Sequence, residues 1–308
     1  MACYHPLNGW IKNGGGFTMK RSEGFSDMPI SVPCGQCIGC KLEKARTWAT
    51  RITHESKMWD MSSFVTLTYD TDIKLKQDPD WDFGLSVEDL QKFIKRLRKK
   101  IAPTKIRYYA CGEYGDQTQR PHYHLIIFNY WPDDLKQIKH NKYGDTLWTS
   151  PSLEKVWGFG NVSVGEVTFE TASYTARYVT KKIDKINEYT NLEKDLEARF
   201  KYRGRKQEFA VMSRGGKGAD GENLYGIGFT YWKKYKNDII ADDTVVVRGR
   251  ETKPPKYYID KLKEENPEVH FDLTKKRLAN YQELDYDDQT RLVEVKTKKQ
   301  LFYKRNTI

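Results

Sequence analysis

The sequence of 308 residues contains no apolar run of the ~18–20 residues that a membrane-spanning helix needs, and no secretory signal peptide opens it. It has no internal repeat and lacks the pattern Gly-x4-Gly-Lys-Ser/Thr, which binds nucleotide phosphates, even in its glycine-rich segment near residues 213–218. Cysteine is scarce: there are five, and an odd count without a secretion signal argues against a disulfide framework. We therefore expect a cytoplasmic protein without membrane attachment.

Charge of one sign predominates. The formal net charge is +11, which suits a polyanionic partner such as nucleic acid. Hydrophobic residues make up 38% of the chain and aromatic residues 13%, so a sizeable core can form in one large domain or two small ones.

Three of the cysteines follow the spacing Cys34-x2-Cys37-x2-Cys40, which is typical of a metal-binding loop. Three thiolates need a fourth ligand, for which Cys3 is the first candidate and His5 the substitute. A closed tetrahedral zinc site would attach the N-terminal arm to the rest of the protein. An iron–sulfur cluster is the alternative, because the same spacing opens the ferredoxin pattern.

A proline-led apolar run at residues 121–129 has the composition of a β-strand. Residues two apart on a strand share a face, so His122 and His124 project together as two potential metal ligands. A second strand at 106–113 ends in a glycine turn. A hairpin between the two strands would bring the carboxylate of Glu113 beside the histidines.

Residues 171–186 have helical spacing, and Tyr174, Tyr178 and Lys181 fall at i, i+4 and i+7 on one helical face. Two phenols and an ammonium group fit poorly in an apolar core, because each needs a polar partner. This stripe is therefore a candidate functional surface.

The remaining pattern predicts an α+β fold, in which an antiparallel sheet carries packed helices. Ser86 begins a capping box, and the helix after it carries a basic face. Taken alone, this face indicates a solvated surface; in a DNA-binding enzyme it could track phosphates. Segment 8–31 is expected to be loop with short extended pieces, and segment 130–149 is an aromatic, polar excursion between elements. Further predicted elements are helices at 41–59, 86–100, 151–157 and 259–303 and strands at 62–69 and 159–167. Within 209–218 a strand is expected to run into a basic glycine loop.

The histidine pair on a strand, followed by Tyr-x3-Tyr-x2-Lys on a later helix, resembles the HUH endonuclease family. The closer likeness is to two-tyrosine rolling-circle replication initiators of microviruses, small single-stranded DNA phages. The run Phe64–Tyr69 resembles the first motif of that family. The segments Met1–Pro6 and Pro33–Cys40 resemble the gokushovirus branch. The likeness runs from Cys3 to about Lys182 and more weakly to about Pro255.

This resemblance implies a palm-like HUH sheet with the histidines on a central strand, in a protein of the bacterial host cytoplasm. Its domains would be a Cys-rich arm (1–40), the nuclease core (41–187) and a basic, DNA-contacting region (188–308). It implies Mg²⁺ or Mn²⁺ at His122, His124 and Glu113, with single-stranded origin DNA as substrate. Tyr178 would be the principal nucleophile and Tyr174 the second, each forming a 5′-phosphotyrosine, and the catalytic Lys181 would stabilise charge.

A host helicase is a candidate partner, and no feature specifies an oligomeric state. Two imidazoles and a carboxylate also describe the triad of non-haem iron oxygenases, which would need neither the tyrosines nor the basic charge. Another HUH enzyme, a plasmid relaxase or single-strand transposase, is a second possibility. The paired tyrosines and the cysteine loop argue against it. A third is a non-catalytic, zinc-stabilised nucleic-acid-binding protein.

Overall fold

The computed structural model describes residues 3–12, 16–115, 118–140, 144–181, 205–217 and 223–280, and single residues or short groups between 287 and 298. The chain divides into two compact units, residues 1–45 with 271–308 and residues 46–270. The domain boundaries expected near residues 40 and 187 stay predictions.

The larger unit is built on a seven-stranded antiparallel sheet with the order β10-β5-β6-β4-β9-β8-β7. The histidine strand β6 is interior, with β5 and β4 as its neighbours. The α+β class expected from the sequence is therefore confirmed. The strands are β4 (Ser62–Tyr69), β5 (Arg107–Tyr114), β6 (Pro121–Phe128), β7 (Lys136–His140), β8 (Thr146–Thr149), β9 (Gly160–Glu166) and β10 (Phe209–Met212).

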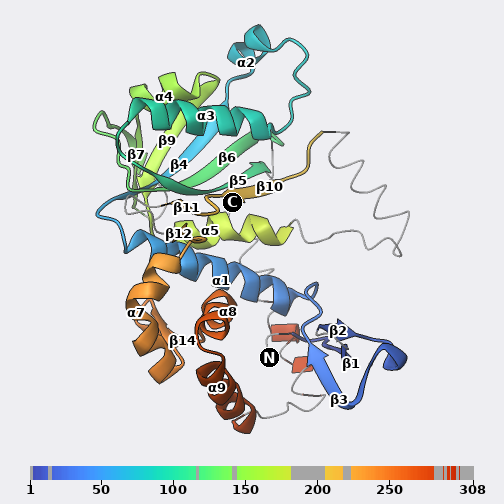
Figure 1. Cartoon of the computed structure of the whole chain (residues 1–308). Helices are drawn as coiled ribbons and strands as arrows, with labels where there is room; N and C mark the ends of the chain where they lie inside the picture. The colour runs from blue at the N-terminus through green and yellow to red at the C-terminus, as the bar shows by residue number, and fades with distance from the viewer. Residues whose placement is uncertain are drawn as a thin grey trace. The chain divides into compact units, whose positions relative to one another are not determined.

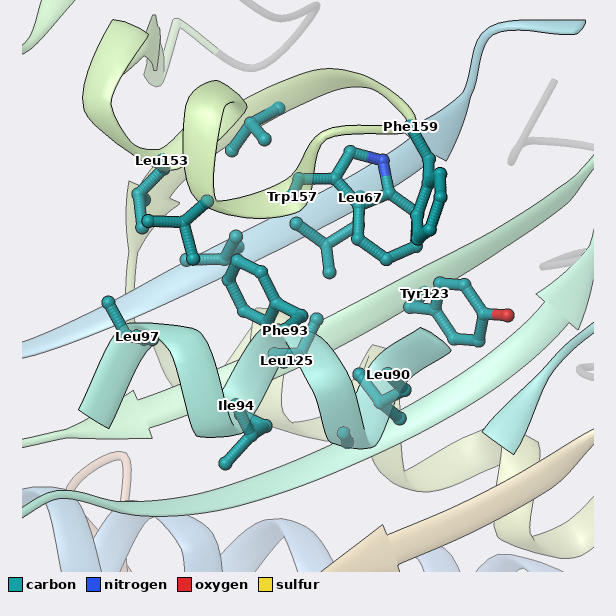
Figure 2. Packing of buried hydrophobic residues seen from close by; sticks show 14 of the residues in the cluster. Leu67, Leu90, Phe93, Ile94, Leu97, Tyr123, Leu125, Leu153, Trp157 and Phe159 are labelled. Atoms are coloured by element: carbon teal, nitrogen blue, oxygen red, sulfur yellow. The ribbon is translucent and has the colours of Figure 1, made fainter. Parts of the chain in front are cut away.

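One face of the sheet packs against helices α3 (Val87–Lys100) and α4 (Pro151–Trp157), which lie together in Figure 1. Figure 2 shows Leu90, Phe93 and Leu97 of α3 among apolar side chains of the strands and of α4. The exposed face of α3 carries the basic residues predicted from the sequence. They are Lys92, Lys95, Arg96, Arg98, Lys99 and Lys100.

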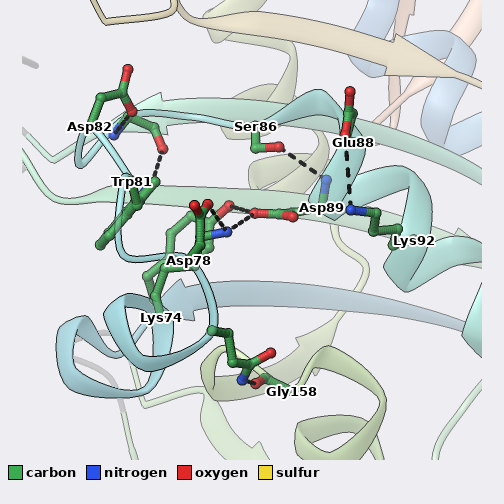
Figure 3. A network of polar contacts seen from close by, with 12 residues as sticks. Lys74, Asp78, Trp81, Asp82, Ser86, Glu88, Asp89, Lys92 and Gly158 are labelled. Carbon is green, nitrogen blue, oxygen red and sulfur yellow. Dashed lines mark hydrogen bonds and ion pairs between the residues drawn. The ribbon is translucent and has the colours of Figure 1, made fainter.

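A polar network fixes the beginning of α3. The Ser86 hydroxyl accepts a hydrogen bond from the Asp89 amide at 3.1 Å, as the capping box predicted. The Asp89 carboxylate in turn accepts from the Lys74 ammonium group at 2.9 Å (Figure 3). Lys74 belongs to α2 (Thr71–Gln77), so this ion pair, buried on both sides, joins two helices.

The opposite face packs against α5 (Phe169–Lys181) and the later turns of α1 (Ile38–Ser56). The small side chains of Ala49, Ala172 and Ala176 let these helices approach Ile126 and other residues of the strands closely. Because side chains alternate along a strand, the even-numbered residues of β6 face α5 and the odd-numbered ones face α3. The helix predicted at 171–186 therefore exists, and residues 182–186 lie outside the described part.

The segment after β10 also packs against α1. Glu55, which is fully buried, accepts hydrogen bonds from Arg107 at 2.8 Å and from the Gly228 amide at 2.7 Å. The described elements here are β11 (Gly216–Lys217), β12 (Asn223–Leu224), α7 (Phe229–Asp242), β13 (Val245–Val247), β14 (Arg250–Thr252), α8 (Lys256–Glu265) and α9 (Pro267–Ala279). The helical tail predicted at 259–303 is interrupted near Asn266, between α8 and α9, and its described residues between 287 and 298 are helical too.

Two segments contain more strand than the sequence indicated. Residues 130–149 contain the hairpin of β7 and β8, and the described residues of 7–32 form a three-stranded sheet where loop with short extended pieces was expected. The latter consists of β1 (Leu7–Lys12), β2 (Phe17–Thr18) and β3 (Gly24–Val32), with a 3-10 turn at Arg21–Glu23. β7 is mostly polar and fully exposed, so it lacks the apolar alternation on which strand prediction depends. β3 is also largely exposed, although it contains apolar residues such as Phe25, Met28 and Ile30. In the described part, no helix is long and apolar enough to cross a membrane.

Candidate metal and tyrosine site

Strand register brings the predicted triad together. Glu113 on β5 pairs directly with His122 on β6, and directly paired residues share a face of the sheet. The Nε2 atoms of His122 and His124 lie 2.7 and 2.8 Å from the same atom, Oε1 of Glu113. The hairpin expected from the sequence therefore places all three side chains at one point.

Neighbouring groups orient both imidazoles. The Nδ1 atom of His122 lies 3.0 Å from the backbone oxygen of Arg120. A carbonyl oxygen only accepts, so Nδ1 of His122 carries a proton. Nε2 donates to Glu113 here, and loss of that proton would leave its lone pair for an ion. His124 Nδ1 lies 3.0 Å from the Thr66 hydroxyl, and the His124 ring stacks on Phe64 with centroids 5.5 Å apart.

The site is buried and holds a negative charge. Burial alone would raise the pKa of Glu113, but hydrogen bonds from His122 and His124 offset it and hold that pKa at about 2. Burial lowers the pKa of His124. Burial also lowers the pKa of His122, but the hydrogen bond and charge of Glu113, together with the Arg120 carbonyl, outweigh it, and the pKa of His122 is raised. The second carboxylate oxygen of Glu113, Oε2, is buried without a hydrogen-bond partner.

Helix α5 adds a phenol to this cluster. The Tyr174 hydroxyl donates to Glu113 Oε1 at 3.1 Å, and its ring lies edge-on to His124 with centroids 5.0 Å apart. Tyr178 and Lys181 belong to the same helix, but their side chains lie outside the described part. Of the predicted stripe, the structure therefore places Tyr174 against the triad.

The donor set fits a divalent ion. The ligand atoms of Glu113, His122 and His124 all lie within 4.8 Å of one another. An ion would also give the orphaned Oε2 of Glu113 a partner, which removes the cost of leaving a buried oxygen unpaired. These residues could hold the ion without rearrangement of the strands.

A second cluster comprises the four cysteines, without His5. The Sγ atoms of Cys3, Cys34, Cys37 and Cys40 lie within 4.8 Å of one another, and those of Cys3 and Cys37 are 3.9 Å apart. Backbone amides point at the sulfurs, for example Cys34 N to Cys3 Sγ at 3.2 Å. Burial raises the pKa of Cys37, but amide and thiol donors outweigh it and lower that pKa to about 6, which favours a thiolate.

Sequence reasoning missed the groups that orient the triad. The sequence placed Thr66 on a predicted strand. Only the pairing register of β4 with β6 shows that it lies opposite His124. The Arg120 carbonyl had no side-chain signal at all.

Comparisons with known proteins agree with the motifs. A family model for replication-associated proteins of the ORF2 type matches residues 62–183. Replication-associated protein VP4 of Bdellovibrio phage phiMH2K is 32% identical over 292 residues, which span 92% of this chain and 85% of that protein. Replication-associated protein ORF2 of Spiroplasma virus 4 is 33% identical over 256 residues, which span 80% and 72%.

A more distant relative is replication-associated protein ORF4 of Chlamydia phage 1, 28% identical over 81% of this chain and 59% of that protein. No solved structure matches this chain. The chain belongs to the family of phage replication-associated proteins, and its expected likeness to microvirus rolling-circle replication initiators is confirmed. The roles assigned to individual site residues stay predictions, as does the HUH name for the fold.

Proposed function

We propose that this protein nicks and rejoins single-stranded DNA at a phage replication origin through a tyrosine–DNA intermediate. The observation that carries the proposal is the convergence of the Tyr174 hydroxyl and both histidine Nε2 atoms on Glu113 Oε1. A non-haem iron oxygenase would need the two histidines and the carboxylate but not this phenol. The family supports a role in starting phage replication.

In the proposed reaction, the phenol oxygen of Tyr174 or Tyr178 bonds to the scissile phosphorus, and the bond from phosphorus to the 3′ oxygen breaks. The phenol loses its proton and the departing 3′ oxygen gains one. The products are a 5′-phosphotyrosine and a free 3′-hydroxyl. Because the phosphodiester energy is kept in the new bond, a later 3′-hydroxyl can reverse the step without ATP. This agrees with a sequence that contains no nucleotide-binding motif.

The triad has two tasks in this reaction. Glu113, His122 and His124 would hold Mg²⁺ or Mn²⁺, which would supply Lewis-acid polarisation of the scissile phosphate. The buried Glu113 also holds the Tyr174 hydroxyl at the triad, so the nucleophile needs little ordering before reaction. Lys181, seven residues further along α5, is the candidate cation for the developing phosphate charge.

The substrate is expected on the α5 side of the sheet. His122, His124 and Tyr174 all lie there, whereas the basic helix α3 covers the opposite face. We therefore assign the basic residues of α3 to contacts with DNA outside the cleavage site. The sequence left open which part of the bound DNA these residues contact, and this assignment excludes the strand at the cleavage site.

Trapping of a covalent adduct tests the function. Origin single-stranded DNA incubated with the protein and Mn²⁺ should yield a species that migrates slowly in denaturing gels. Tyr174→Phe and Tyr178→Phe should each still form some adduct, and the double variant none. His124→Ala should lose the adduct but keep DNA binding, because phosphate contacts dominate affinity. Adduct formation by the double variant would refute the mechanism.

We further propose that the four cysteines hold one structural Zn²⁺. Thiolates bound to a single tetrahedral zinc at about 2.3 Å lie about 3.8 Å apart. The separation of 3.9 Å between Cys3 and Cys37 fits this geometry. An iron–sulfur cluster would need its thiolates spread around several metal atoms, so the compact arrangement favours the single ion.

A further inference from the structure

The strand β10 brings a second buried carboxylate beside the triad. Phe209 on β10 pairs with Gly112 on β5, so Glu208 lies at the register position opposite Glu113. Directly opposite residues on antiparallel strands have Cβ atoms about 4.5–5.5 Å apart and share a face. Glu208 is 4% exposed, and its Oε1 accepts one long hydrogen bond, 3.4 Å, from the Tyr114 amide.

Neither of these two carboxylates is paired with a permanently charged lysine or arginine in the described part of the chain. Within the described residues, neither Glu113 nor Glu208 forms an ion pair within 4.0 Å with a lysine or arginine, and Glu113 is paired with histidines alone. Burial of a carboxylate with a single long hydrogen bond, as for Glu208, is costly, and two carboxylates on neighbouring strands also repel each other. The site therefore carries an excess of negative charge, which a divalent cation would neutralise.

Glu208 and Glu113 occupy opposite register positions on one face of the sheet, so the charge of Glu208 lies beside the metal-binding side chains. An ion of charge +2 with Glu113 and two neutral imidazoles would leave one positive charge in a buried site. With Glu208 the sum is zero.

We propose that Glu208 is a second carboxylate beside the metal site, which supplies the negative charge that a divalent ion requires in a buried place. The ligand atoms themselves stay those of Glu113, His122 and His124. The inference rests on the proposed function, because it assigns a further residue to the same metal. It assigns no role in bond breaking to Glu208.

Binding of Mn²⁺ to the full-length protein without DNA tests this. The free ion, measured by electron paramagnetic resonance, should give a Kd about 10-fold weaker for Glu208→Gln than for wild type. The amide oxygen of glutamine can still accept from Tyr114, so the fold is kept. Without added Mn²⁺, loss of the uncompensated charge should raise the melting temperature, and Mn²⁺ should then stabilise the variant less than wild type. Glu166→Gln, an exposed carboxylate on β9, is the matched control and should bind Mn²⁺ normally.

Unchanged Mn²⁺ affinity in Glu208→Gln would overturn the proposal and leave Glu208 as a structural acceptor. If this variant does not fold, Mn²⁺ binding to Glu208→Asp provides the test. It keeps the charge and should stay within a few-fold of wild type, and a complete loss of Mn²⁺ binding would contradict the charge argument. Absence of Mn²⁺ binding in wild type would overturn both the triad and Glu208. Failure to trap a DNA adduct, with Mn²⁺ binding still dependent on Glu208, would instead refute only the nicking function.

Discussion

Acid should destabilise the larger unit through a single histidine, His54 on α1. Its side chain is almost fully buried, and its ring stacks on Tyr231 with centroids 3.8 Å apart. Nδ1 lies 2.9 Å from the Tyr258 hydroxyl, and Nε2 is buried without a partner. A proton on Nε2 would thus have no acceptor. Burial, with a smaller contribution from Lys57, lowers the pKa of His54 from 6.5 to about 3.

The direction follows from proton linkage. Between pH 6.5 and about 3 the unfolded chain binds a proton at His54 that the native protein excludes. The stability that neutral His54 contributes is therefore complete above pH 6.5 and is lost as the pH falls through this window. At pH 5 the unfolded state gains about 2 kcal/mol from protonation, on the order of a 30-fold change in the unfolding equilibrium.

Urea unfolding followed by tryptophan fluorescence measures this loss. Wild type should lose about 2 kcal/mol of unfolding free energy between pH 7.5 and 5.0 through this histidine. His54→Asn, whose amide can still reach Tyr258, should lose about 2 kcal/mol less unfolding free energy than wild type over the same pH range, whatever its stability at pH 7.5. His140→Asn, at an exposed position on β7, should keep the wild-type dependence. Equal pH dependence in wild type and His54→Asn would refute the reasoning, as would an NMR titration of His54 near pH 6.5.

Two further predictions concern stability. Tyr123→Phe removes the hydroxyl that accepts from the Ser86 amide at 2.7 Å, so chemical denaturation should show a loss of about 1–3 kcal/mol. Tyr130→Phe should change little, because the hydroxyl of this buried residue forms no hydrogen bond within the described part of the chain; equal losses in both variants would contradict the assignment. Metal analysis should find about one zinc per chain, and chelation should lower the melting temperature of the wild-type protein. Chelation should not change the melting temperature of Cys37→Ser, because this variant has already lost the ion. Visible charge-transfer absorption of the fresh protein would instead indicate an iron–sulfur cluster.

The parts of the fold that were predictable have a strong local signal. The strand Ser62–Tyr69 alternates between buried and half-exposed residues, so its period of two is visible in the sequence. The capping box at Ser86 and the apolar stripe after it located α3 to within a residue. His122 and His124 were predictable as a pair, because their shared face depends only on the strand period.

What could not be predicted depends on pairings between distant segments. Glu208 lies 95 residues after Glu113, and only the register of β10 against β5 makes them neighbours. Thr66 reaches His124 through a similar pairing of β4 with β6. The hairpin β7–β8 was missed for a different reason, since all five residues of β7 are exposed and carry no apolar period. Secondary-structure propensity describes each segment alone, whereas these features depend on how two segments pair.

The strand β6 connects the chemistry to the core. His122 and His124 face Glu113 and Tyr174, while Tyr123 between them points to the other face, where Figure 2 shows it beside Leu90 and Leu125. A slip of one residue would bury both imidazoles in that apolar core and place a phenol in the metal site. The hydroxyl of Tyr123, 2.7 Å from the Ser86 amide and 2.8 Å from the Tyr69 hydroxyl, opposes this slip from the far side of the sheet. The same side chain that stabilises the fold thus fixes which residues can hold the ion.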